Sequence, residues 1–152
     1  MSWKVGASIA AVLMLLGTYA AFAGETITEP GTIRITDREI KRTEVDVGAR
    51  GISAGDVQSI RHLLYNRRIT RKAIGHSELV CTSTGNQSSM CNGSYFLPKG
   101  RIVVGGIVRS PLFYELAVLG GTGLYDNAQG TLTVTSLRRN PVEELLVFRL
   151  VG

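Results

Sequence analysis

Leu119-Gly-Gly-Thr-Gly-Leu-Tyr-Asp-Asn-Ala-Gln-Gly130 joins two runs of alternating apolar residues through four glycines. Glycine reaches backbone angles with positive φ that other residues adopt only with strain, so the stretch predicts sharp bending between two strands. A glycine-rich loop can also cradle a nucleotide, but that motif leads from a strand into a helix, and its P-loop form carries a lysine. Here the pattern of a strand follows, from Thr131 to Ser136. We therefore interpret the stretch as a structural turn or bulge.

Short runs with strand-like patterns recur on both sides of this stretch. They span residues 32–36 with a charge-rich continuation to 47, then 56–65, 70–84, 88–97, 101–108, 112–119, 128–136 and 143–150. The run 56–65 also fits one face of a helix, and we favour a strand because the downstream segments alternate. Eight strands with short links predict an all-β fold, an eight-stranded antiparallel β-barrel, with a two-sheet sandwich as the alternative. In the barrel, Gly120 to Gly123 is the hinge between the sixth and seventh strands. We expect its glycines to form part of the wall of a pocket inside the barrel.

The first residues have the pattern of an export signal. Lys4 precedes an apolar core, Val5 to Tyr19, and Ala21-Phe-Ala23 fits a cleavage site. A membrane anchor needs about 20 apolar residues, and this run is interrupted by glycine, serine and threonine. We therefore predict a signal peptide at 1–23 and a single domain at 24–152. The protein is then secreted or periplasmic, without stable membrane insertion.

Cys81 and Cys91 are the only cysteines, and they lie symmetrically about a predicted turn at Gly85-Asn86. An exported protein meets an oxidising environment, and the hairpin brings the two sulfur atoms together, so we predict one disulfide. A redox-active pair is usually separated by two residues rather than nine. A metal site needs three or four ligands, and with only two histidines in the chain we expect none.

The chain is mildly basic, with a formal net charge of +5, or about +4 without Lys4. Nucleic-acid binding is typically marked by basic residues interleaved with aromatic ones on a single element. The densest basic cluster instead lies around a predicted hairpin turn, at Arg67, Arg68, Arg71 and Lys72. We interpret it as a solvated loop tip, with an acidic membrane or wall surface as the alternative, and we expect no nucleic-acid partner.

The chain resembles the allene oxide cyclase and dirigent barrels. The likeness rests on Gly51-Ile-Ser-Ala-Gly-Asp56, on Cys81 and Cys91, on Leu97-Pro-Lys-Gly-Arg-Ile-Val103 and above all on the segment from Leu116 to Gly130. The resemblance implies an eight-stranded barrel, often oligomeric, with an apolar cavity that opens at one end. Relatives include plant enzymes that cyclise a fatty-acid epoxide, proteins that steer the coupling of phenoxy radicals, and bacterial cyclases that act on polyketides.

The resemblance also implies a shared way of directing the reaction, and this chain departs from the dirigent sequence pattern at one position. An apolar pocket that fixes a flexible substrate selects one ring closure among several, and it needs no cofactor for this. Dirigent proteins tend to have an arginine between the alanine and glycine after their glycine-rich motif, and they use it in the pocket. This chain has Gln129 there, so the dirigent mechanism does not transfer to it.

Candidate catalytic acids begin with Glu78. This residue shares one face of a strand with His76 and Val80. If that face points inward, Glu78 and His76 share a proton in an apolar cavity, with His76 also contacting the ligand. If it points outward, Glu78 is an ordinary surface residue.

The other candidates are two acids and two tyrosines. Asp56 follows a glycine-rich loop at the mouth of a strand, where it is an acid or a cap for backbone N–H groups. Glu115 lies beside an apolar strand residue and is a pocket acid or an exposed one. Tyr95 and Tyr114 are candidate ligand-binding residues, or core residues whose hydroxyl groups reach water.

Two function classes follow. The first is a secreted barrel that binds a small unsaturated or phenolic molecule and steers its cyclisation or isomerisation without a cofactor. The second is a non-catalytic barrel that binds an apolar small molecule or serves as an interaction module. An inward-facing acid distinguishes them, with candidates Glu39, Glu44, Asp56, Glu78 and Glu115. Residues 102–108 are apolar on both faces, which indicates a homo-oligomer.

Overall fold

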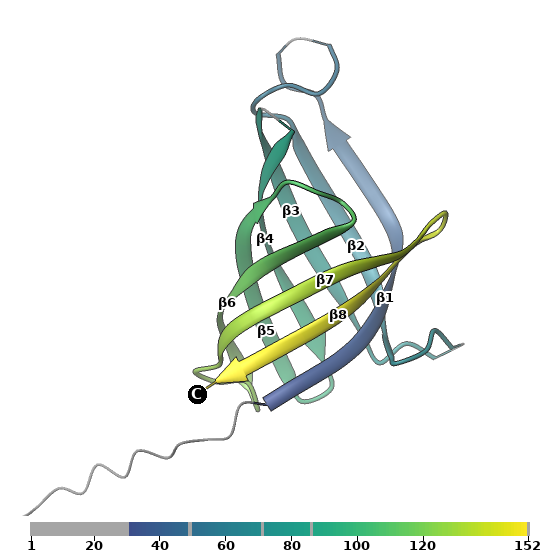
Figure 1. Ribbon diagram of the computed structural model, residues 1–152, viewed down its shortest axis with the longest axis vertical. Coiled ribbons are helices and arrows are strands. Elements are labelled where there is room, and N and C mark those ends of the chain that lie inside the picture. The colour runs from purple at the N-terminus through teal and green to yellow at the C-terminus, as the bar shows by residue number, and fades with distance from the viewer. Residues whose placement is uncertain (1–30, 49, 71, 86, 152) are drawn as a thin grey trace, which may run out of the picture.

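The computed structural model describes residues 31–48, 50–70, 72–85 and 87–151, and these form a closed antiparallel barrel (Figure 1). Neighbouring strands pair in chain order, and pairing of the first strand with the last closes the sheet. The strands are β1 (Gly31–Val45), β2 (Val57–Asn66), β3 (Gly75–Gly85), β4 (Ser88–Leu97), β5 (Gly100–Val108), β6 (Phe113–Gly123), β7 (Gln129–Arg139) and β8 (Val142–Val151). The predicted all-β barrel is confirmed, including a strand over most of 56–65. The predicted signal peptide, 1–23, lies outside the described residues.

One half of the barrel interior is filled by large side chains. Tyr95 from β4 and Phe148 from β8 pack edge to face, with ring centroids 5.2 Å apart. Buried aliphatic side chains from β2, β5, β6, β7 and β8 surround them, among them Leu64, Ile102, Val104, Leu116, Leu132 and Leu146. An eight-stranded barrel is just wide enough for such side chains to fill, so this half is a packed core.

Strand β1 includes the charge-rich continuation of the first predicted run. The residues after Thr36 continue the same strand to Val45, paired with β2 throughout and with β8 as far as Arg38. A bulge lies between Glu39 and Lys41, with Ile40 as the extra residue. Because side chains alternate between the two faces of a strand, one extra residue reverses which of the following residues face inward.

The glycine-rich stretch forms the end of β6, the turn 124–128 and the start of β7. Gly123 has φ of 66°, and a Cβ atom there would lie 2.5 Å from the carbonyl oxygen of Lys99, so only glycine fits. The prediction of a bend between the sixth and seventh strands is confirmed. A bulge in β6 precedes this bend, where Leu119 is passed over between the residues paired with Val103 and Val104 of β5.

The predicted disulfide is present. Cys81 and Cys91 are directly opposite each other on β3 and β4, with their Cα atoms 4.0 Å apart, and both side chains are buried. No helix among the described residues is long and apolar enough to span a membrane.

Apolar side chains are also exposed on the outside of the barrel. Val80, Met90 and Ile107 lie on the adjacent strands β3, β4 and β5, and each is at least 40% exposed. They include one outward residue of the apolar run 102–108. The homo-oligomer inferred from that run stays a prediction.

Candidate active site

A pocket of about 360 Å³ opens at the end of the barrel away from the start of β1 and the end of β8. Small inward-facing side chains leave the space, including Ser89, Ser136 and Val108, and the Cys81–Cys91 disulfide is part of the wall. The glycines of the stretch from Leu119 to Gly130 do not line this pocket, so the expectation that they form its wall is wrong. They lie at the opposite end, where the filled core begins.

A wider hollow of about 880 Å³ lies at that opposite end, between Ile33, Tyr125 and Leu150. None of the described residues that line it is an aspartate, glutamate or histidine. The pocket near the disulfide, in contrast, combines acids, a histidine and a tyrosine with apolar walls. Because convergent polar groups in an apolar cavity are typical of ligand and catalytic sites, we take it as the candidate site.

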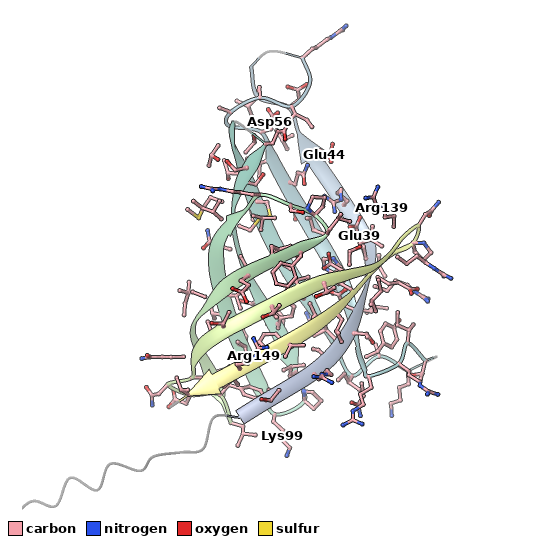
Figure 2. The ribbon with its side chains drawn as sticks, viewed as in Figure 1. Glu39, Glu44, Asp56, Lys99, Arg139 and Arg149 are labelled. Carbon is pink, nitrogen blue, oxygen red and sulfur yellow. A yellow bond between two sulfur atoms is a disulfide. The ribbon has the colours of Figure 1, made fainter. Side chains whose placement is uncertain are left out.

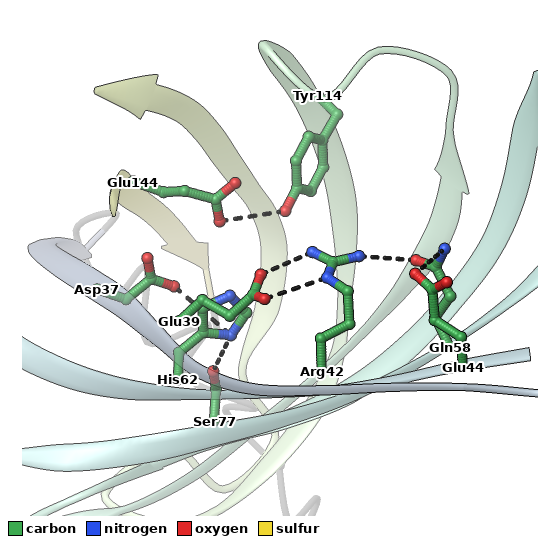
Figure 3. A network of polar contacts seen from close by, with 9 residues as sticks. All are labelled: Asp37, Glu39, Arg42, Glu44, Gln58, His62, Ser77, Tyr114 and Glu144. Atoms are coloured by element: carbon green, nitrogen blue, oxygen red, sulfur yellow. Dashed lines mark hydrogen bonds and ion pairs between the residues drawn. The ribbon is translucent and has the colours of Figure 1, made fainter. Parts of the chain in front are cut away.

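Four polar side chains form the inner part of this pocket and its floor: Asp37, His62, Tyr114 and Glu144 (Figure 3). They come from four strands, β1, β2, β6 and β8. Asp37 and Glu144 are directly opposite each other across the β1–β8 pairing. Two carboxylates opposite each other repel when both are charged, so this register favours the protonation of at least one of them.

Asp37 is the most deeply buried of these groups, with 0% of its surface exposed. Neither of its carboxyl oxygens has a hydrogen-bond partner among the described residues. Burial, and secondarily the charge of Glu144, raises the pKa of Asp37 well above its ordinary value. A neutral, protonated Asp37 is the state that this environment favours.

Glu144 reaches the pocket itself. Burial raises the pKa of its carboxyl group to about 7. The Tyr114 hydroxyl donates a hydrogen bond to Glu144 Oε2 at 3.4 Å, and burial raises the pKa of Tyr114, so the phenol keeps its proton. Glu144 is therefore present in both protonation states near neutral pH, which suits a group that both gives and takes a proton.

His62 is neutral at physiological pH, because burial lowers its pKa to about 4. Its Nδ1 lies 4.0 Å from Asp37 Oδ2, a distance at which a charged histidine would form an ion pair. With an uncharged ring and a protonated Asp37, we interpret the contact as polar packing. The closer partner is the hydroxyl of Ser77, 3.2 Å from the same nitrogen.

Asp37, His62 and Glu144 each offer one atom within 4.8 Å of the others, a spacing at which three groups could hold a metal ion. Two of the three already have hydrogen-bond partners, Ser77 on His62 and Tyr114 on Glu144. We interpret the group as a proton-handling cluster, and the measurement of metal content described below decides between the two interpretations.

The structure places Glu78 and His76 outside the pocket. Their face of β3 points outward, where Glu78 is 57% exposed and lies 3.7 Å from Arg61. His76 stacks on Phe96 with ring centroids 4.5 Å apart. The inward alternative for this pair is therefore wrong, because the opposite face of β3 carries Ser77, Leu79 and Cys81 into the barrel.

Asp56 and Glu115 also lie away from the pocket. The Asp56 carboxylate accepts hydrogen bonds from the backbone N–H groups of Val47 and Ser53, which lower its pKa, and it holds together the loop at the tip of the molecule (Figure 2). Glu115 lies on the outer face of β6 and accepts a hydrogen bond from Thr133 at 3.1 Å. Neither carboxylate is brought to the acids of the pocket.

The two candidate tyrosines lie in different parts of the barrel. Tyr114 lines the pocket and contacts Glu144. Tyr95 is 1% exposed and belongs to the filled core. Of the acids named as candidates for an inward position, Glu39 and not Glu78 lines the pocket.

Sequence reasoning missed Asp37, His62, Arg42 and Glu144. A signal for three of them is present in the alternation of the strands. Asp37 continues the phase of Ile33 and Ile35, His62 lies between Ile60 and Leu64, and Glu144 precedes Leu146, Phe148 and Leu150 in the same phase. A polar residue at an apolar position of an alternating strand faces the interior. Arg42 gives no such signal, because the bulge changes the phase before it.

Neither a protein-family model nor a curated protein matches the sequence. Solved structures do match. A pyocyanin demethylase is 22% identical with a TM-score of 0.65, over 76% of this chain and 98% of that one. An exo-specific intermolecular Diels-Alderase is 15% identical with a TM-score of 0.66, over 81% and 98%. A pterocarpan synthase dirigent protein is 14% identical with a TM-score of 0.64, over 82% and 95%.

These likenesses show that the chain has the same barrel fold as the dirigent proteins and the Diels-Alderases. At such low identity they establish the shared architecture alone. The barrel fold that the resemblance implied is thereby confirmed. A specific relation to the allene oxide cyclases is not.

Proposed function

We propose that the protein is an exported enzyme that binds a small unsaturated or phenolic molecule in the barrel pocket and steers its isomerisation or cyclisation by proton transfer. The observation that carries the proposal is the pair of the buried Glu144 and the half-buried Tyr114 in the pocket wall, hydrogen-bonded to each other at 3.4 Å. The fold neighbours support it, because they include a Diels-Alderase and a pterocarpan synthase dirigent protein. The Cys81–Cys91 disulfide supports a location outside the cytoplasm.

Glu144 is the proton-transfer group in this proposal. As a carboxylate it takes a proton from one carbon of the ligand, and as a carboxylic acid it returns the proton to another atom. The product has the same composition as the substrate, and Glu144 ends in its starting state. A pKa of about 7 makes both forms available at neutral pH. Such a group contributes about 10²- to 10⁴-fold to a rate.

The other polar groups have supporting roles. The Tyr114 phenol orients the Glu144 carboxyl group through its only O–H, and its oxygen is placed to accept a hydrogen bond from a ligand hydroxyl. Asp37 is too deeply buried to touch a ligand. It acts as a positioning residue for Glu144, from the side of Glu144 that faces away from the pocket. Ile60, Leu79 and Val108 form the apolar part of the wall, which holds the body of the ligand in one conformation.

The test begins with molecules that co-purify with residues 24–152, identified by mass spectrometry. The purified protein is then incubated in D₂O with a panel of small β,γ-unsaturated ketones and phenols. Proton transfer is followed by NMR as deuterium incorporation and isomer formation. We expect Glu144→Gln to lower the rate at least about 100-fold and Tyr114→Phe to lower it less. Asp126→Asn, an exposed carboxylate in the β6–β7 turn at the other end, is the matched control and keeps the rate.

Three outcomes contradict the proposal. Turnover that Glu144→Gln leaves unchanged removes the proton-transfer role. Turnover that a chelator abolishes and an added metal ion restores, with stoichiometric metal in the protein, assigns the cluster to a metal. Tight binding of a co-purified ligand without conversion of any panel member makes the protein a binding barrel.

A further inference from the structure

The mouth of the pocket carries an arginine that the proton-transfer proposal does not use. Arg42 lines the pocket together with Glu39 and Gln58. It faces inward because of the bulge in β1, since the pairing is Glu39 with His62 before the bulge and Arg42 with Ile60 after it. In a regular register without the bulge, Ile40 would lie opposite Arg61 and Lys41 would take the inward position opposite Ile60, so that Arg42 would face solvent. The bulge therefore directs this guanidinium into the barrel.

The Arg42 guanidinium is held in one orientation. Its Nε and Nη2 donate to the two carboxyl oxygens of Glu39 at 3.1 and 2.7 Å, and its Nη1 donates to Gln58 Oε1 at 2.8 Å (Figure 3). Gln58 is in turn fixed by Glu44 at 3.2 Å. A guanidinium has five N–H donors, so two remain without an acceptor among the described residues. A fixed fork with free donors is pre-organised to bind an oxyanion.

The charges around the mouth favour an anion. The described residues that line the pocket include Arg42, Arg138 and Arg139 against two acids, Glu39 and Glu144. Glu39 is already paired with Arg42, and His62 is neutral. Arg138 has only a distant partner, Glu143 at 3.9 Å, and Glu143 is bound more closely by Arg38 at 2.8 Å. The mouth therefore has an excess of positive charge, which attracts anionic ligands.

We infer that Arg42 binds the anionic group of the ligand at the pocket mouth, so that the substrates are unsaturated or phenolic molecules that carry a carboxylate or another oxyanion. The inference rests on the proposed function for the use of the pocket, and it names the class of molecule that the pocket accepts. The anionic group lies against the free donors of Arg42, with Arg138 and Arg139 adding long-range attraction. The unsaturated body then extends past Ile60 and Leu79 toward Glu144.

The position of Arg42 also connects binding to the proton-transfer group. The positive charge of Arg42 lowers the pKa of Glu144, so the two groups act on each other across the pocket. An anion that neutralises Arg42 weakens this effect, and the pKa of Glu144 then rises. Binding of the correct ligand thus favours the protonated form of Glu144, which is the form that donates a proton.

The test uses a matched pair of probes, trans-cinnamate and methyl cinnamate, which share a flat unsaturated body and differ in charge. Dissociation constants are measured by calorimetry at low and at high salt. We expect the wild type to bind cinnamate at least tenfold more tightly than the ester, with the preference reduced by salt. Arg42→Gln removes the preference, weakening cinnamate at least tenfold and the ester less than twofold. Arg42→Lys keeps part of it, because the charge remains and the fork is lost.

The control is Arg61→Gln, which removes an arginine from the outer face of the adjacent strand β2 and leaves the preference unchanged. A second measurement follows the Glu144 carboxyl carbon by NMR. Its titration moves to higher pH when cinnamate binds to the wild type, and also in Arg42→Gln without ligand. An arginine that only stabilised the β1–β2 pairing would produce neither the charge preference nor the ligand-induced shift.

The inference is overturned if the wild type binds the ester as tightly as cinnamate, if neither probe binds, or if Arg42→Gln weakens both probes equally. These results are separable from failure of the proposed function. Charge-selective binding with turnover independent of Glu144 would leave the anion site intact and remove the catalytic role. Turnover that depends on Glu144 without any charge preference would do the reverse.

Discussion

The two halves of the barrel are built on the same backbone pattern and filled differently. Toward the start of β1 and the end of β8, the inward positions carry Tyr95, Phe148 and large aliphatic residues, which pack together as a core beside the hollow at that end. Toward the Asp56 loop they carry serines, the disulfide and four titratable groups, which leave about 360 Å³. The filled half resembles the core of any small domain, whereas the open half has buried polar groups in place of packing. The difference shows how one closed sheet holds both a packed core and a cavity lined by polar groups.

The largest expected effect is in the filled half. Phe148→Ala removes a fully buried ring and lowers the free energy of unfolding by about 4 kcal/mol. Val108→Ala, in the pocket wall, lowers it by about 1 kcal/mol or less, because the side chain already borders empty space. Chemical denaturation measures both, and Phe148→Leu serves if the alanine variant does not fold. Equal losses at the two sites would remove the distinction between the halves.

The next effect concerns the buried acid of the open half. Because the folded pKa of Glu144, about 7, is above its ordinary value of 4.5, the folded state holds this proton more tightly than the unfolded state. Its contribution to stability is therefore largest at low pH and is lost as pH rises from about 4.5 to about 7.

Glu144→Gln removes this dependence. Relative to the wild type, the variant gains about 3 kcal/mol in unfolding free energy between pH 4.5 and pH 8. His62, whose lowered pKa makes stability rise between about pH 4 and pH 6.5, is present in both proteins and cancels in the difference. Denaturation curves at four pH values measure the change. A constant difference in unfolding free energy between the two proteins across this range would mean that the pKa of Glu144 is not raised in the folded state.

The disulfide is expected to contribute slightly less. It closes a short loop between β3 and β4 in the wall of the open half, where packing is incomplete. The double variant Cys81→Ser, Cys91→Ser should lose about 2 to 3 kcal/mol of unfolding free energy. Reduction of the wild type by dithiothreitol should give the same loss, which controls for the new hydroxyl groups. A loss below about 0.5 kcal/mol would show that the open half is held by its strand pairing alone.

The smallest effect is at the turn that ends the filled half. Gly123→Ala places a methyl group against the Lys99 carbonyl and requires a positive φ, which together lower stability by about 1 to 2 kcal/mol. Gly31→Ala is the control, because nothing lies within 4 Å of a Cβ atom there and its φ is not in the positive range that strains a side chain. Thermal unfolding distinguishes the two. An unchanged Gly123→Ala variant would mean that the turn relaxes without loss.

The sequence by itself determined the strands, their antiparallel order, the disulfide and the bend at the glycine-rich stretch. These follow from local rules: alternation of apolar residues, turn residues and the spacing of two cysteines about a hairpin. Tyr114 was found in the same way, as an aromatic residue in a strand. Such features depend on neighbours in the chain and are therefore readable without coordinates.

Only the tertiary structure decided which face of each strand points inward and which residues meet there. Glu78 and Ser77 are adjacent in sequence, yet one faces solvent and the other the barrel interior. Asp37 and Glu144 lie over a hundred residues apart and become neighbours through the closing β1–β8 pair. A single bulge at Ile40 turns Arg42 inward. Closure and register set these contacts, because a shift of one residue exchanges the two faces of a strand.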